Sequence, residues 1–213
     1  MGDVVRFGLT AFVTLLVVVD PFGVVPIFVS LTEGAGAQRR AGILRRALAV
    51  AFGVSMFFLL AGRGALSYLG VTVHAFAISG GVLLFLTALP MLFGQRGGLQ
   101  APERGEPVQA GADISIFPLA IPLLSGPGAI TTILLFTAQA GSDLLRLLVL
   151  ALAIAAVFVV ARFVLRQGER LVEKVGEGGV HIVTRVMGIL LAALAVQFVL
   201  DGVTSYSGSL APR

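Results

Sequence analysis

The chain has 213 residues, of which 57% are hydrophobic and only 12% are charged, and its mean hydropathy is +1.02. Soluble domains carry about 25% charged residues, so this composition excludes a soluble globular domain and predicts an integral membrane protein. The formal net charge of +4 does not indicate nucleic-acid binding, because the basic residues lie in short connectors between apolar runs. The chain has no cysteine, which excludes disulfides and thiolate metal sites.

Six apolar stretches follow one another along the chain, and each can cross a hydrocarbon core about 30 Å thick. They cover residues 4–31, 44–61, 73–93, 114–140, 144–165 and 182–203, with polar or glycine-rich connectors between them. The first stretch lacks a small-residue cleavage site, so we expect it to remain in the mature protein. The predicted fold is an all-α membrane protein with six transmembrane helices.

The positive charges are distributed unevenly between the two sides of this predicted bundle. Eleven of the 15 Lys and Arg residues fall on one side, including the pairs Arg39-Arg40 and Arg45-Arg46. Short cytoplasmic loops carry an excess of positive charge. We therefore expect a multi-pass protein of a bacterial or archaeal inner membrane, with both termini outside.

The two halves of the chain resemble each other when displaced by 106–107 residues. The matching positions are Pro21 and Pro127, Gly70 and Gly176, Val73-His74 and Val180-His181, Gly81 and Gly188, and Leu83-Leu84 and Leu190-Leu191. Residues 1–94 are the first predicted repeat, 95–113 a cytoplasmic linker rich in glycine, proline and charge, and 114–213 the second repeat. A unit of three spans ends on the side opposite to its start, so its duplicate is inserted upside down, as in secondary transporters.

The first span of each repeat carries an unusual run of prolines and glycines. The first contains Asp20-Pro21-Phe22-Gly23 and Pro26, and the second contains Pro118, Pro122 and Ser125-Gly126-Pro127-Gly128-Ala129. Proline and glycine weaken a helix, and a capping residue before proline is typical of a helix start. Helices 1 and 4 are therefore predicted to be discontinuous, each made of two half-helices meeting in mid-membrane. The alternative interpretation is that these prolines only kink the helices so that the helices pack together.

A half-helix that begins inside the membrane presents free N–H groups, which suit an anion such as a carboxylate. Asp20 is the only carboxylate well inside a predicted span, and ionisable groups at that depth are functional candidates. It could take a proton, hold an ammonium group or bind a cation. Alternatively, it only caps the half-helix that it precedes.

Other polar residues are weaker candidates. Thr131 and Thr132 lie one turn past the second break, where they line a cavity or bond their own backbone. Ser79-Gly80-Gly81 favours close helix packing, and His74 and His181 favour interfacial anchoring. No catalytic constellation, metal-ligand cluster or cofactor motif occurs, so we expect neither an enzyme nor a bound cofactor.

The motifs around Asp20-Pro21-Phe22-Gly23 and Ser125-Gly126-Pro127-Gly128-Ala129-Ile130 closely resemble the MarC family of bacterial and archaeal inner-membrane proteins. The resemblance covers residues 7–203 and includes the six-span layout. It implies a relation to SnatA-like transporters, which move glycine and alanine with ion coupling, and to the amino acid exporters of the LysE superfamily.

The expected function is secondary transport of small neutral amino acids, with a proton or sodium as coupling ion. The predicted substrate-binding residues are Asp20, Pro21, Phe22, Gly23, Ser125, Gly126, Pro127, Gly128, Ala129 and Thr131, and Asp20 is also the predicted coupling residue. An exporter of drugs or other metabolites, or a non-transporting scaffold or sensor, are the alternatives. The expected partners are the substrate and the lipid bilayer, with a homo-oligomer left open and no nucleic acid.

Overall fold

The computed structural model of the protein describes residues 2–93 and 113–210. These residues are almost entirely helical and include no strand. The elements are α1 (Gly2–Val19), α2 (Pro21–Leu31), α3 (Ala37–Tyr68), α4 (Val73–Phe93), η1 (Ser115–Leu124), α5 (Pro127–Ala140), α6 (Leu144–Arg166) and α7 (Gly168–Leu210). The all-helical prediction is confirmed, and residues 95–112 of the predicted linker lie outside the described residues.

Five stretches are long and apolar enough to cross a membrane, and a sixth is present if a bent pair counts as one span. The five are Gly2–Leu31, Ala37–Tyr68, Val73–Phe93, Leu144–Arg166 and Gly178–Ser207. The bent pair consists of η1 and α5, whose axes differ by 50°. All six coincide with the apolar stretches of the sequence.

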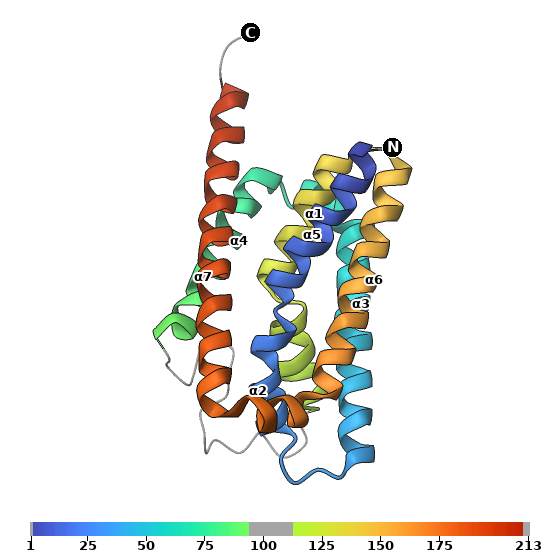
Figure 1. The fold of residues 1–213 in the computed structure, drawn as a ribbon. Coiled ribbons are helices and arrows are strands. Elements are labelled where there is room, and N and C mark those ends of the chain that lie inside the picture. Colours follow the sequence, from blue (N-terminus) through green and yellow to red (C-terminus); the bar gives the residue numbers. More distant parts are fainter. Residues whose placement is uncertain (1, 94–112, 211–213) are drawn as a thin grey trace.

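Two predicted connectors are helical, which corrects the sequence-based boundaries. Residues 62–68 continue α3, and residues 168–179 belong to α7, where only Gly176 leaves helical geometry, with φ 70°. Figure 1 shows this first part of α7 lying across the base of the bundle before the long helix rises. Hydropathy locates the lipid-facing part of a helix, whereas the helix itself continues through residues with good helix propensity such as Arg, Leu and Ala.

The helices alternate in direction through the bundle. Successive helices run in opposite directions through the bundle, from the α1–α2 pair through α3, α4, α5 and α6 to α7. Both described ends of the chain therefore lie at the same end of the bundle (Figure 1). We call the other end, where α2 ends and α3 begins, the basic end. The first turns of α3, the last turns of α6 and the start of α7 bring basic residues there, namely Arg39, Arg40, Arg45, Arg46, Arg162, Arg166, Arg170 and Lys174.

The α4 and α7 helices form the most extensive helix pair. A Cβ atom added at Gly81 would lie 2.7 Å from the Ala195 carbonyl oxygen and 2.9 Å from Val199, and one at Gly188 would lie 3.3 Å from Leu92. Small residues allow membrane helices to approach this closely. The Gly81–Val199 and Gly188–Leu92 contacts are related by one displacement of 107 residues.

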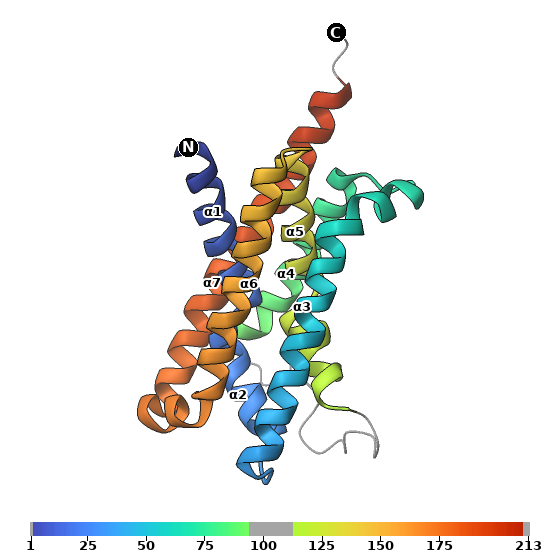
Figure 2. The same ribbon diagram turned by 90° about the vertical axis from the view of Figure 1, so that its right-hand side faces the viewer.

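The remaining helices pack beside this pair. In Figure 2, α3, α5 and α6 run side by side, and α1 packs against α6. At the basic end, Arg46 Nη1 lies 2.7 Å from Asp113 Oδ2. The pKa of the Asp113 carboxyl lies below its usual range, because the Ser115 hydroxyl and amide donate hydrogen bonds to it and Arg46 adds a positive charge. These contacts anchor the start of η1 against α3.

The Gly81→Ala substitution should lower the stability of the folded protein by roughly 1–3 kcal/mol, because its methyl group would press on the Ala195 carbonyl. The apparent melting temperature in detergent measures this loss. The matched control is Gly53→Ala on α3, where no atom lies within 4 Å of the added Cβ. The control should melt at the same or a slightly higher temperature, and an equal loss in both variants would contradict the close α4–α7 contact.

Candidate functional site: two buried helix breaks

The first break lies at Asp20, between α1 and α2. Asp20 has φ 43° and ψ 62°, a left-handed conformation that Asp tolerates better than most residues. Its Oδ1 accepts a hydrogen bond of 3.1 Å from the Gly23 amide, and the residue is only 5% exposed. The carboxylate therefore satisfies one first-turn amide of α2, where a backbone donor would otherwise be buried without a partner.

The glycine of the Asp-Pro-Phe-Gly motif is explained by this cap. A Cβ atom at Gly23 would lie 2.1 Å from Asp20 Oδ2 and 3.1 Å from Met91 Cε. The carboxylate thus folds over the glycine and occupies the space of a side chain. The position of the Asp20 carboxylate therefore requires glycine at position 23.

The second break lies at Ser125 and Gly126, between η1 and α5. Within η1, Phe117 and Ile121 are extended, and each precedes a cis proline. The Ser125 hydroxyl and amide both donate to the Ala120 carbonyl, at 3.1 and 3.0 Å. Ser125, a predicted binding residue, therefore uses its hydroxyl proton within the break itself.

The start of α5 differs from the start of α2, because it has no side-chain cap. Gly126 is the N-cap residue and Pro127 the first helical residue, so the first amides available are those of Gly128 and Ala129. The Ile130 amide donates to the Gly126 carbonyl at 3.1 Å and is not available. Gly128 and Ala129 are both buried, which leaves two uncapped donors in an apolar environment.

The two breaks lie close together and α4 covers both. A Cβ atom at Gly128 would lie 3.0 Å from Val18, in the last turn of α1, and 2.7 Å from Leu84 of α4. Met91 of the same helix reaches Gly23 at the first break. The sequence motifs indicated the two breaks, but nothing in them indicated the contribution of Leu84 and Met91.

The two threonines of α5 behave differently. Thr132 Oγ1 donates to the Gly128 carbonyl at 2.8 Å, as threonine in a membrane helix commonly does. Thr131 is fully buried, and its Oγ1 has no hydrogen-bond partner in the described part of the chain. A Cβ atom at Gly80 of α4 would lie 1.9 Å from that oxygen. Gly80 therefore makes the space that the Thr131 hydroxyl fills.

Not every predicted residue is enclosed by the site. Phe22 is 39% exposed, whereas Pro21 is buried in the first turn of α2. The buried polar groups at the two breaks that could contact a ligand are the Asp20 carboxylate, the amides of Gly128 and Ala129, and the Thr131 hydroxyl.

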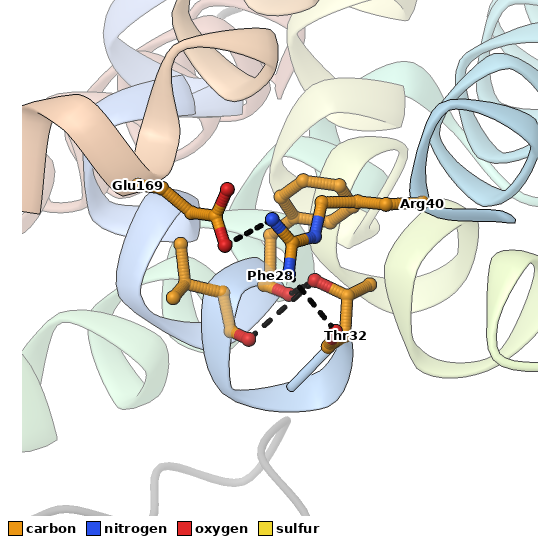
Figure 3. Close-up of polar contacts among 5 residues, drawn as sticks. Phe28, Thr32, Arg40 and Glu169 are labelled. Atoms are coloured by element: carbon orange, nitrogen blue, oxygen red, sulfur yellow. Dashed lines mark hydrogen bonds and ion pairs between the residues drawn. The ribbon is translucent and has the colours of Figure 1, made fainter. Parts of the chain in front are cut away.

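A polar cluster at the basic end was not predicted from the sequence. Figure 3 shows Arg40 of α3 between Glu169 of α7 and the carbonyl of Thr32, at the end of α2. Arg40 and Glu169 lie on different helices, α3 and α7, so no local sequence pattern could have indicated this cluster.

The Gly23→Ala substitution should destabilise the protein by roughly 1–3 kcal/mol, because its methyl group would collide with the Asp20 carboxylate. Removing that carboxylate should remove the collision, so Asp20→Ala combined with Gly23→Ala should melt close to Asp20→Ala alone. Melting temperatures of the two single variants and the double variant complete the cycle. Additive losses would show that Gly23 is not packed against Asp20.

Comparison with known proteins places the chain among membrane proteins. Residues 5–206 match the family described as MarC family integral membrane protein. A UPF0056 membrane protein of Archaeoglobus fulgidus is 36% identical over 92% of this chain and 92% of its own length. The UPF0056 inner membrane protein YhgN of Escherichia coli strain K12 is 35% identical over 92% of this chain and 95% of its own length. No solved structure matches the chain. The resemblance seen in the two proline-glycine motifs is confirmed, and the chain is a multi-pass integral membrane protein that belongs to the MarC family.

Proposed function

We propose that the protein is a proton-coupled secondary transporter of small neutral amino acids, built from two inverted three-helix repeats with discontinuous first and fourth helices. The observation that carries this proposal is the meeting of two buried helix breaks. One break is capped by its own carboxylate, and the other leaves two amides uncapped. Interrupted helices that meet near the midplane are typical of transporter binding sites.

The internal symmetry supports the two-repeat architecture. Gly81 contacts Val199, and Gly188 contacts Leu92. Gly81 is equivalent to Gly188 and Leu92 to Val199, since each pair is 107 positions apart in the sequence. Gly70 and Gly176, at equivalent positions before the last helix of each half, have φ values of 69° and 70°. The halves also run in opposite directions through the bundle (Figure 1). An inverted repeat accounts for all three features.

The chemistry of the breaks suits a zwitterion with a small side chain. In the proposed complex, the Gly128 and Ala129 amides at the positive end of α5 hold the substrate carboxylate. Asp20 holds the ammonium group or carries the coupled proton. Gly128 already packs against Val18 and Leu84, so the space beside it admits little more than the side chain of glycine or alanine.

One observation favours a second candidate, a membrane scaffold or sensor that transports nothing. Asp20, Ser125 and Thr131 are at most 5% exposed, as expected if the breaks are permanently packed. A transporter in an occluded state has the same burial. The two functions differ in whether solute reaches the breaks, so a flux measurement separates them.

Proteoliposomes with an imposed pH gradient should accumulate labelled glycine and alanine. The Asp20→Asn variant should take them up at least about tenfold more slowly, which corresponds to an activation free energy about 1.4 kcal/mol higher. Asparagine keeps the capping oxygen, so the fold should survive while the charge is lost. The matched control is Asp201→Asn, which makes the same substitution at an exposed position on α7 and should leave uptake unchanged.

Uptake that follows a sodium gradient instead would replace the proton as the coupling ion. Full proton-driven uptake by Asp20→Asn would remove Asp20 from the mechanism. No uptake of either amino acid under any gradient, by protein with a normal melting curve, would reject amino acid transport in favour of the scaffold.

A further inference from the structure

The cluster at the basic end joins the two halves of the chain. Arg40 Nη2 donates to the Thr32 carbonyl at 3.2 Å, and Arg40 Nη1 forms an ion pair with Glu169 (Figure 3). Thr32 is 1% exposed, and its own hydroxyl donates to the Phe28 carbonyl at 2.7 Å. One arginine of α3 therefore ties the end of α2 to the start of α7, and so the first half of the chain to the second.

The contacts of Arg40 at this junction of α2, α3 and α7 are formed, but not all of its hydrogen-bond donors have a partner. The Arg40 side chain is 18% exposed, whereas that of Glu169 is 53% exposed. The Arg40 Nε atom is buried and has no partner among the described residues. A buried donor without an acceptor raises the free energy of the closed arrangement, so the junction can open at a lower cost than a fully bonded one.

The repeat relates this junction to two residues at the opposite end of the bundle. Arg40 is equivalent to Arg146, and Arg63 to Glu169, because each pair is 106 positions apart in the sequence. Pro21 and Pro127 are related by the same displacement. The counterpart of the Arg40–Glu169 pair is therefore Arg146 with Arg63. These are two positive charges, which cannot form an ion pair.

The described residues at that opposite end reflect this difference. Arg146 Nε lies 3.4 Å from Asp143 on its own helix, and its guanidinium lies 6.0 Å from the Phe7 ring centroid. Arg63 Nη1 donates a long hydrogen bond of 3.4 Å to the Gly141 carbonyl. In the described part of the chain, no ion pair joins the two halves at this end.

We propose that Arg40, Thr32 and Glu169 form a one-sided gate that holds the resting protein closed at its basic end. Inverted repeats exchange their conformations when access alternates, so the state closed at the other end would bring Arg146 towards Arg63, where like charges repel. The inference rests on the two-repeat transporter of the preceding section. It adds that the two access states are unequal in energy, and it names the residues responsible.

The absence of cysteine allows a direct test that needs no substrate. A single reporter, Ala129→Cys, places a thiol in the first turn of α5, where the native residue is 4% exposed. Its rate of labelling by a membrane-impermeant maleimide is measured from each side, in right-side-out and inside-out vesicles. Denatured protein verifies that the thiol is intact and reactive.

In this background, Glu169→Gln should raise labelling from the side of the basic end at least fivefold, and Arg40→Gln should do the same. Glu169 is half exposed, so its variant should fold even if loss of Arg40 does not permit folding. Arg63→Glu should also raise labelling from that side, because the new carboxylate can pair with Arg146 and favour the opposite closed state. The matched control, Arg63→Gln, removes the charge without supplying an acid and should have less than half of that effect.

The gate is rejected if Glu169→Gln leaves labelling unchanged, if Arg63→Gln matches Arg63→Glu, or if the Ala129→Cys thiol of the folded protein stays unlabelled from both sides in every variant. Failure of the transport proposal looks different. Labelling of the reporter that responds as expected, together with no glycine or alanine uptake by the native protein without the Ala129→Cys reporter, would keep the gate and reject the substrate. Proton-driven uptake with unresponsive labelling would keep the transporter and reject the gate.

Discussion

The structure depends on one constraint, which is that backbone N–H and C=O groups inside a lipid bilayer must find partners within the protein. Two apolar stretches of this chain are interrupted at buried positions in the bundle, and each interruption releases such groups. At the first break, Asp20 supplies an acceptor to the Gly23 amide, and at the second, Ser125 returns to the Ala120 carbonyl. The amides of Gly128 and Ala129 are the exception, and in the proposed function they hold the anionic group of the substrate.

Four glycines of this chain allow close approach between groups, and they do so in two ways. Gly81 and Gly188 allow α4 and α7 to approach until backbone meets backbone. Gly23 and Gly80 make room for a polar side chain of the site itself, the Asp20 carboxylate and the Thr131 hydroxyl. Because α4 supplies both kinds of contact, the helix that joins the halves also covers both breaks.

In the proposed inverted repeat, the positions at which the two halves differ are informative. Asp20 caps α2, whereas the equivalent start of α5 has no side-chain cap, so the paired breaks offer a negative group and a positive helix end side by side. At the two ends of the bundle, an arginine–glutamate pair corresponds to two arginines. In the proposed two-repeat transporter, such charge differences would decide which of two similar conformations is more stable and which ligand binds between the repeats.

The sequence alone determined the membrane class, the positions of the six apolar stretches, the two breaks, the basic side and the family. Each of these follows from local properties, since hydropathy, proline geometry and charge act on the residues that carry them. Only the tertiary structure decided that residues 62–68 and most of 168–179 are helical. It also decided which groups meet at the breaks, where Val18 contacts Gly128 and α4 contributes Leu84 and Met91. The ion pair between Arg40 and Glu169 likewise depends on the packing of distant helices. In a chain so uniformly apolar, hydrophobic pattern does not distinguish the faces of a helix. Which helices touch is decided by the close fit of small residues and by a few polar pairs, and both depend on all the helices together.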